Sequence, residues 1–490
     1  MKSHKFEQYT NAILAGIVSE GMYIVLGLLN LWLINQILEK DDFGSFIFIL
    51  AIFQILTLMG TGGLDRSLLF RISGQEQDTG KKVLIGGENA SFSLITSFGY
   101  SLFLGAGIVV MVMSVNGGNI EIYQLWLLVI SAALPFQVAQ EIMSSWFVAN
   151  KRVAEARLIS QIRPFCYLCF LVVVLIFFKT RYGVAAAFLG ASISTTLFWF
   201  FWAGPSNLKK PEWPGRFDVV YAVKLMFTKM AHIGLDRTDL LMLGLLAGNT
   251  ATAEFAVAAR LSNITKIGNK LLTPIFTPRM RFSIANLQHT DLKREYAQNR
   301  LFGFVSSFFG LVLLILFGPF LLSVFGDYKT AWNVLIVLAS VQLVKSAFGP
   351  NGQYLSMSGY GTATLFTTLS LLIMCIALNW IMIPVWGTMG AAFATLLSIS
   401  IIQIVISYLI KKWDDFSTLD WQVVLVLFVA AFMLVLMSGY FDLKAFTAIL
   451  MLLPAGWLII KQKKLWLPVF KEIKVSFSNS TIFGKTDQRE

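Results

Sequence analysis

TAEFAVAARLSNITKIGNKLLTPIFTP, which spans residues 252–278, is a long and mostly apolar stretch with three cations in its middle: Arg260, Lys266 and Lys270. A cation at the centre of a bilayer costs about 2.5–3.5 kcal/mol. At about 100° per residue, Arg260, Asn263 and Lys270 fall on one side of a helix, with Lys266 beside them. The pattern predicts a transmembrane helix whose polar stripe faces a water-filled cavity. A cationic cavity inside a membrane favours an anionic passenger.

The composition favours a membrane protein. Of the 490 residues, 56% are hydrophobic and 13% are charged, whereas a soluble protein carries about 25% charged residues. Three cysteines provide no disulfide framework. The C-x-x-C pair of Cys166 and Cys169 lies in an apolar run, where packing is the expected role. No cleavable signal peptide is evident, because the first apolar segment is too long and contains Glu20.

Apolar segments of membrane-spanning length recur along the chain and predict an all-α integral membrane protein. We expect about fourteen transmembrane helices, at 12–37, 44–64, 84–114, 121–149, 159–178, 184–204, 222–247, 252–278, 299–325, 331–356, 361–383, 388–410, 420–438 and 443–460. The glycines and proline near 349–352 predict a kink in the tenth of these.

The distribution of cations predicts the orientation. If the N-terminus is cytoplasmic, 29 of the 39 lysines and arginines lie in inward-facing segments, five in outward loops and five within spans. This asymmetry matches the positive-inside rule and places both termini in the cytoplasm. It also explains the net charge of +12 without a nucleic-acid partner.

The two halves of the chain resemble each other. YGVAAAFLGASIS (182–194) parallels GTMGAAFATLLSIS (387–400) at an offset of 205 residues. An even number of helices per half implies parallel repeats that enclose a central cavity. The predicted organisation is two six-helix lobes, two additional transmembrane helices and a basic cytoplasmic tail, at 1–205, 206–411, 412–460 and 461–490 respectively.

Three stretches resemble the Wzx/RfbX-type polysaccharide (O-antigen) flippases of the multidrug/oligosaccharidyl-lipid/polysaccharide (MOP) superfamily. NWIMIPVWGTMGAAFATLLSISI (379–401) resembles their eleventh-to-twelfth helix junction, and DRTDLLMLGLLAGNTATAEFAVAARLSNI (236–264) is similar to their seventh-to-eighth helix region. FGSFIFILAIFQILTLMGTGGLDRSLLFRIS (43–73) looks like their second helix. The chain departs from the pattern at Ala253 and Glu254, where many relatives have Val-Gly.

The resemblance covers about the first 410 residues and implies a two-lobed helical transporter of the bacterial cytoplasmic (inner) membrane. The implied activity is translocation of an undecaprenyl-pyrophosphate-linked oligosaccharide, such as an O-antigen repeat unit for lipopolysaccharide, by alternating access. The implied partners are this lipid-linked substrate, membrane lipids and the polysaccharide polymerase machinery.

The pyrophosphate of such a substrate needs cations in order to cross hydrocarbon. We therefore predict a pyrophosphate-binding group, for which salt bridges with buried acids are the alternative role: Arg260, Lys266, Lys270, Asn263, Lys345 and Arg237. Amide and carboxylate side chains are expected to meet the sugars, and interhelical hydrogen bonding is the alternative for them: Gln137, Glu141 and Gln342.

Three acids within predicted spans are candidates for the site of a coupling proton or sodium ion: Glu20, Asp236 and Asp239. The alternative is charge balance, because Asp236 and Asp239 flank Arg237 and breaking a buried pair leaves an uncompensated charge.

The sequence carries no signature of an enzyme. P-loop, zinc-site, Ser-His-Asp and paired-carboxylate spacings are missing from it, so we expect no catalytic residue, no metal site and no cofactor. Two alternative functions stay open. An ion-coupled multidrug exporter would favour acids in its cavity, so the five cations within spans count against it, whereas a peptidoglycan lipid-precursor flippase would need the same cations. A membrane-embedded glycan polymerase or ligase would have a large outward loop, and none is visible in the sequence.

Overall fold

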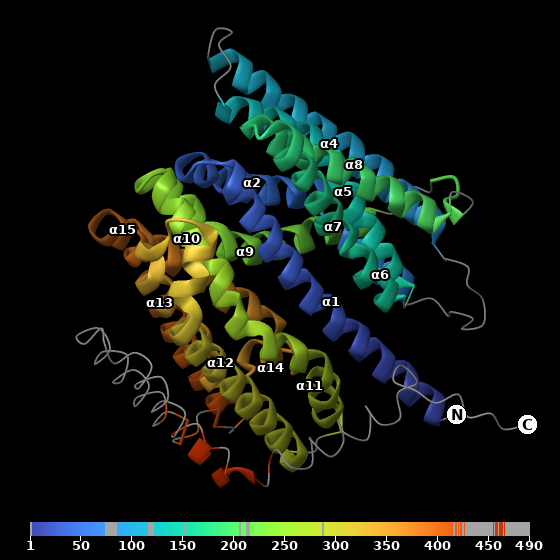
Figure 1. Ribbon diagram of the computed structural model, residues 1–490. Helices are drawn as coiled ribbons and strands as arrows, with labels where there is room; N and C mark the ends of the chain where they lie inside the picture. The colour runs from blue at the N-terminus through green and yellow to red at the C-terminus, as the bar shows by residue number, and fades with distance from the viewer. Residues whose placement is uncertain are drawn as a thin grey trace, which may run out of the picture.

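The computed structural model describes residues 2–73, 86–115, 122–150, 152–204, 207–211, 216–286 and 289–414, together with isolated residues between 417 and 465. Every regular element in this part of the chain is helical (Figure 1). Eight of the described helices are long and apolar enough to cross a membrane. The prediction of an all-α, multi-pass membrane protein is therefore confirmed. The total of fourteen stays a prediction, because 420–438 and 443–460 fall largely outside the described residues.

The first half of the chain forms the elements α1 to α8, including a π-helical segment, η1. Two of them, α3 and α6, are short helices that follow the spans α2 and α5. The bounds are α1 Lys2–Ile37, α2 Lys40–Thr61, α3 Leu64–Ser73, α4 Gly87–Val115, α5 Ile122–Ala149, α6 Val153–Ser160, α7 Ile162–Val173, η1 Val174–Phe178 and α8 Arg181–Ala203.

The second half forms the elements α9 to α15, including two 3₁₀ segments, η3 and η4. The bounds are α9 Arg216–Leu246, α10 Asn249–Ser262, η3 Asn263–Lys266, α11 Ile267–Ala285, α12 His289–Phe325, η4 Lys329–Ala331, α13 Trp332–Phe348, α14 Asn351–Met357 and α15 Gly361–Asp414.

Two of the predicted spans are broken. The span predicted at 252–278 is interrupted by η3, so that Arg260, Lys266 and Lys270 lie on α10, η3 and α11 instead of on one helix. The predicted kink in 331–356 is a complete break at Gly349, whose φ of 79° favours glycine. Pro350 has no N–H with which to continue α13. The two spans predicted at 361–383 and 388–410 are the arms of α15, which meet at Gly387 (φ 55°).

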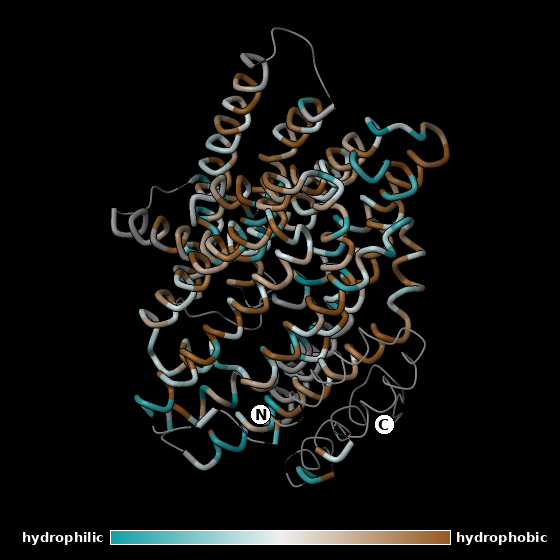
Figure 2. Tube along the Cα trace, turned by 90° about the vertical axis from the view of Figure 1, so that its left-hand side faces the viewer, coloured by the Kyte–Doolittle hydropathy of each residue, from teal (hydrophilic) through white to brown (hydrophobic). Residues whose placement is uncertain are grey.

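Helices α4 to α8 gather in one bundle and α9 to α15 in another, with α1 and α2 between them (Figure 1). Both α1 and α2 contact helices of each bundle. Hydrophobic residues run along the helices, and hydrophilic residues concentrate at the turns (Figure 2). The largest hydrophobic core cluster continues from one bundle into the other, which gives the described helices a common core. The predicted lobe boundaries at 205 and 411 stay a prediction.

Glycines bring α2 very close to the second bundle. A Cβ atom on Gly44 would lie 1.8 Å from the carbonyl oxygen of Asn249, and one on Gly244 would lie 2.3 Å from a ring carbon of Phe48. Real Cβ contacts are not this short, so only glycine fits at these two positions. At Gly44 the backbone of α2 therefore lies directly against the first residue of α10, and at Gly244 the ring of Phe48 on α2 lies directly against the backbone of α9.

Polar contacts join the two halves at the first turn of α2. The Lys40 ammonium lies 2.7 Å from a carboxylate oxygen of Glu254 on α10. The Tyr328 hydroxyl donates a hydrogen bond of 2.6 Å to Asn35 at the end of α1. Burial and the nearby Glu254 carboxylate raise the pKa of Tyr328, so its hydroxyl keeps the proton that it donates. The departure from the family pattern at Glu254 thus has a structural role.

Candidate functional site

The break at η3 divides the predicted polar stripe into two parts. Arg260 lies in the last turn of α10, and its guanidinium lies beside α1, where a Cβ on Gly27 would be 3.9 Å from it. Lys270 lies one turn into α11, and its ammonium is 5.8 Å from the ring centre of Tyr23, also on α1. These two cations therefore face the first half of the chain.

Lys266 faces a different set of helices. It is close enough to interact electrostatically with Lys345 on α13 and with Asp236 and Arg237 on α9. The side chains of Lys345 and Asp236 are exposed, whereas Arg237 is half-buried. The sequence places these residues nearly 110 positions apart, and the fold brings them together.

Arg163 joins the same group from the first half of the chain. It lies on α7 and interacts electrostatically with Tyr23, which also interacts with Arg260 and Lys270. Its guanidinium stacks over the ring of Phe188 at 5.0 Å. Arg163 falls inside the span predicted at 159–178, and a cation within an apolar segment was the signal that could have identified it.

We call this group the cationic cluster. It comprises six cations drawn from both halves of the chain: Arg163, Arg237, Arg260, Lys266, Lys270 and Lys345. In the described part of the chain, no ion pair within 4.0 Å involves Arg163, Arg237, Arg260, Lys266 or Lys345. Among the described residues, the buried Nε of Arg237 also has no hydrogen-bond partner.

The excess of cations has a direct energetic consequence. Buried charges are normally paired, because an isolated charge loses its hydration. The cluster instead keeps some of its charged groups accessible, and Tyr23 at its centre is 43% exposed. Such an arrangement is stable if water or an anion reaches the side chains.

Asn263 lies at the junction of α10 and η3. Its backbone N–H bonds to the carbonyl oxygens of Arg260 and Leu261, and its side chain is half-buried. Asn263 therefore helps to form the break that turns Lys266 away from Arg260.

The predicted sugar-binding residues lie in three different settings. Gln137 is buried, and its side-chain oxygen has no partner among the described residues. Glu141 lies 3.5 Å from Lys229 on α9 and interacts electrostatically with Arg163. Gln342 is buried on α13 beside Ser346. Only Glu141 is thus placed next to a cation of the cluster by these contacts.

The three predicted ion-coupling acids also separate. Asp236 is exposed and interacts electrostatically with Arg237 and Lys266. The side chain of Glu20 lies outside the described residues. Asp239 points instead toward the two arms of α15, as described next.

Asp239 is surrounded by polar side chains from the second half of the chain. Its carboxylate accepts hydrogen bonds from Asn379 Nδ2 at 2.7 Å, from Thr395 Oγ1 at 2.8 Å and from the Cys375 thiol at 3.4 Å. The side-chain oxygen of Asn379 is buried and lacks a partner among the described residues. Among the described residues, no ion pair or hydrogen bond joins Asp239 to Arg237, so no contact supports the expectation that Asp239 balances the charge of Arg237. The sequence could have indicated a role for Asn379, because it is a lone asparagine within an apolar span.

Comparisons with known proteins agree with this architecture. The profile of the family described as polysaccharide biosynthesis protein matches residues 12–280. No curated protein matches the chain.

Three solved structures with the same fold share 14–15% sequence identity with this chain. An inward-facing multidrug resistance MATE family transporter of the MOP superfamily aligns with a TM-score of 0.61, at 15% identity, over 82% of this chain and 99% of its own. Its outward-facing counterpart aligns with a TM-score of 0.56, at 14% identity, over 81% and 94%.

A MOP superfamily transporter from Pyrococcus furiosus, whose binding pocket of reverse polarity is said to suggest a different function, aligns with a TM-score of 0.57, at 15% identity, over 81% and 94%. The predicted family is thus confirmed: the chain belongs to the polysaccharide biosynthesis protein family and has the fold of a MOP superfamily transporter.

Proposed function

We propose that this protein is a flippase that moves an undecaprenyl-pyrophosphate-linked oligosaccharide, such as an O-antigen repeat unit, across the bacterial cytoplasmic membrane. The observation that carries the proposal is the cationic cluster, in which cations from both halves of the chain meet around Tyr23 with few acids among them. Family membership supports a role in polysaccharide biosynthesis.

The chemistry of the substrate fits the cluster. Pyrophosphate is the part of a lipid-linked sugar that cannot enter hydrocarbon unaided, whereas the polyprenyl tail can remain in the lipid. Arginine binds phosphate oxygens in a bidentate manner, and lysine acts as a mobile point charge. Arg163 and Arg260 are therefore suited to bind the pyrophosphate in a fixed position. Lys266, Lys270 and Lys345 lower the free energy of the pyrophosphate as it moves through the protein.

The proposed movement follows from the two-part architecture. The lobes 1–205 and 206–411 open toward the cytoplasm, admit the head group between them and then rock to open outward. Helices within 412–460 and the tail 461–490 accompany the second lobe, and both termini are cytoplasmic. The exported unit is then available to the polysaccharide polymerase machinery. Gln137, Glu141 and Gln342 are proposed to contact sugars along this path.

A multidrug exporter is the main rival, because MATE transporters share the fold. An exporter of cationic drugs would favour acids at the positions where this chain has cations. The reported link between pocket polarity and function in the Pyrococcus furiosus transporter supports the use of charge to separate the two functions. The substrate of a peptidoglycan lipid-precursor flippase also carries a pyrophosphate, so the two substrates differ only in their sugars.

We also propose that Asp239 is the site of the coupling ion, either a proton or Na⁺. Its carboxylate lies among neutral oxygen, nitrogen and sulfur groups rather than beside a cation, and the unpartnered Asn379 oxygen is available as a further ligand. A site without a fixed counter-charge can alternate between an ion-bound and an ion-free state. Asp236, which lies beside Arg237, is better suited to balancing charge.

Replacing Arg260 by alanine is expected to reduce glycan export at least about tenfold, because a charge-assisted contact to phosphate contributes about 1.5–3 kcal/mol. Arg260→Lys should retain part of the activity. Each variant is introduced into a deletion strain, and surface glycan and accumulated lipid-linked intermediates are measured at matched protein levels. Lys329→Ala, which removes one exposed cation outside the cluster, serves as the control and should complement fully.

Full complementation by both Arg260→Ala and Lys270→Ala would contradict the head-group assignment. Unchanged surface glycan in the deletion strain, together with increased drug sensitivity, would instead favour the exporter.

Replacing Asp239 by asparagine is expected to lower ion-driven transport at least about tenfold, because the amide keeps the size of the side chain but cannot carry the ion's counter-charge. Transport is measured in proteoliposomes under a proton gradient or a Na⁺ gradient. Asp236→Asn is the matched control and should retain the ion dependence. Unaltered ion dependence in Asp239→Asn would show that the coupling site lies elsewhere.

Cysteines placed at Lys270 or Lys345 are expected to react with a membrane-impermeant maleimide at least about tenfold faster than one at Phe103, because thiols react as thiolates, which form in water and not in lipid. Phe103 on α4 is 75% exposed on an apolar surface. A cysteine there is therefore accessible, like those at Lys270 and Lys345, but it faces an apolar environment. The experiment uses protein in membranes with its native cysteines replaced. Equally slow labelling at all three positions would place the cluster against lipid.

A further inference from the structure

A network of neutral hydrogen bonds joins the elements that carry the three lysines of the cationic cluster. It connects Asn269 on α11 with Ser307 on α12 and Ser346 on α13. The side-chain nitrogen of Asn269 donates to the Ser346 hydroxyl oxygen at 2.7 Å and to the Ser307 hydroxyl oxygen at 3.2 Å. The two hydroxyl oxygens are 2.8 Å apart. The function proposed above does not use these side chains.

The same network reaches the 3₁₀ segment η3. The Ser307 hydroxyl donates a hydrogen bond of 3.1 Å to the carbonyl oxygen of Thr265. Thr265, Ser307 and Ser346 are all buried. Buried polar groups that satisfy one another in this way hold their segments in one arrangement, because leaving one of them without a partner is costly. The network therefore fixes η3, α11 and α13 relative to α12.

Three members of the network are direct neighbours in sequence of the three lysines. The neighbouring pairs are Thr265 with Lys266, Asn269 with Lys270, and Ser346 with Lys345. Successive residues of a helix point about 100° apart. The network can therefore lie inside the second half of the chain while Lys270 and Lys345 are exposed. Each lysine is thus attached to backbone that the network holds.

Two glycines of α12 allow η3 and α11 to come close to this helix. A Cβ atom on Gly303 would lie 2.1 Å from the side-chain oxygen of Asn269, and one on Gly310 would lie 2.9 Å from the Cα atom of Thr265. The two glycines are seven residues apart, which is about two turns, so they lie on the same face of α12. This face supports the break between α10 and α11.

The lysines need such a support because they repel one another. Lys266 interacts electrostatically with both Lys270 and Lys345. A lysine ammonium is a point charge on a flexible four-carbon stem, so the region it can occupy is set by the backbone that carries it. Backbone held by the network keeps the three ammonium groups near one another in spite of their repulsion.

We propose that Asn269, Ser307 and Ser346 are positioning residues that set the preference of the cationic cluster for a head group with two phosphates. The inference rests on the function proposed above, which assigns the lysines to the pyrophosphate. A pyrophosphate contacts more cations at once than a monophosphate, so it gains more from cations that are already held in place. Lysines on a loosened backbone adapt to either head group, and the preference falls.

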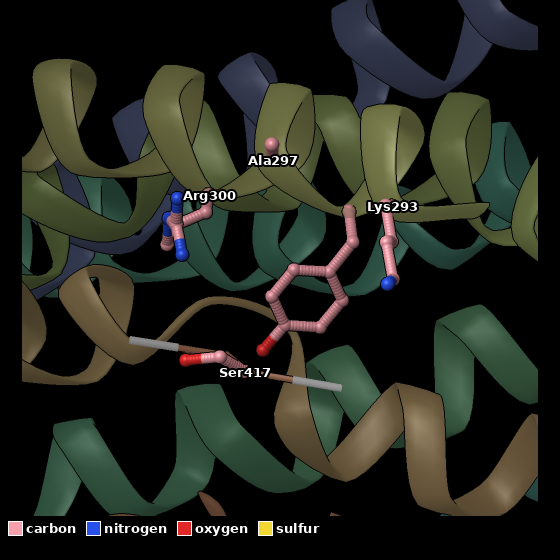
Figure 3. Close-up of a pocket in the computed structure, with 5 residues that line it drawn as sticks. Lys293, Ala297, Arg300 and Ser417 are labelled. Atoms are coloured by element: carbon pink, nitrogen blue, oxygen red, sulfur yellow. The ribbon is translucent and has the colours of Figure 1, made fainter. Parts of the chain in front are cut away.

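A second buried network in the same half of the chain provides a matched control. Asn351 on α14 also donates two side-chain hydrogen bonds, to Gln403 at 2.9 Å and to Ser407 at 3.0 Å. It bonds in addition to the hydroxyl of Tyr296, a residue that lines the pocket shown in Figure 3 at the start of α12. Asn351 has no cation beside it in the sequence.

The test measures equilibrium binding of a short-chain polyprenyl pyrophosphate and of the matching monophosphate to the purified full-length protein. The wild-type protein is expected to prefer the pyrophosphate at least about tenfold, because the second phosphate adds charge-assisted contacts. Asn269→Ala should lower this preference at least about threefold. Ser346→Ala, a smaller change that leaves Asn269 in place, should lower it in the same direction. Asn351→Ala should change it less than about twofold.

Thermal unfolding of each variant is followed in parallel, which separates a loss of stability from a loss of selectivity. If Asn269→Ala does not fold, Ser346→Ala decides. A preference that persists in the folded variants would overturn the inference and leave the proposed function intact, as would equal wild-type binding of the two phosphorylated lipids. An equal loss in Asn351→Ala would also overturn it, because it would indicate general loosening. Equal wild-type binding of the pyrophosphate and the uncharged polyprenol would contradict the proposed function itself, and the inference with it.

Discussion

The cost of holding positive charge inside a bilayer is the constraint on which the rest of this structure depends. A cation inside hydrocarbon costs a few kcal/mol, and the chain gathers six cations in one cluster. A fold that satisfied them with acids would be a structural salt-bridge network. In the described part of this chain, however, Asp65 and Glu254 form ion pairs with Lys229 and Lys40. Glu141 and Asp236 interact electrostatically with the cluster, but neither forms an ion pair there within 4.0 Å with Arg163, Arg237 or Lys266. The cluster is thus left with an excess of positive charge that an anionic passenger can neutralise.

The arrangement of the helices makes this excess functional. Arg163 on α7 and Arg237, Arg260 and Lys270 on α9, α10 and α11 interact electrostatically with Tyr23 on α1, a helix that contacts both bundles. Glycine contacts hold α2 against α9 and α10 along the neighbouring seam. An anion bound at the cluster therefore touches both halves of the chain at once. In the proposed cycle, binding of the pyrophosphate adds attraction between surfaces that otherwise repel each other, which links occupancy to movement of the lobes.

Much of the fold could be predicted from hydrophobic segments, because membrane-spanning helices need long apolar runs. The breaks were predicted unevenly. Gly349 and Pro350 predicted the end of α13. The residues of η3, Asn263–Lys266, gave no such indication, because this 3₁₀ segment depends on packing against neighbouring helices. For the same reason the periodicity of one straight helix grouped Lys266 with Arg260, although the interruption turns them toward different partners.

The candidate site shows the same division. Arg260, Lys266 and Lys270 could be singled out because charge is rare in apolar segments. The arrival of Arg163 from another helix could not be derived, because it requires the pairing of α7 with α1. The neighbours of Asp239 were equally hidden, since Asn379 and Thr395 come from two arms of α15 that meet only in the folded protein.

Equilibrium binding of a short-chain polyprenyl pyrophosphate and of the matching uncharged polyprenol to the purified protein tests the central claim most directly. The account predicts that the pyrophosphate binds at least about tenfold more tightly than the alcohol, and that Arg163→Ala removes most of this difference. Equal affinity for the charged and the uncharged lipid would contradict it, because the cluster would then contribute nothing to recognition of the passenger.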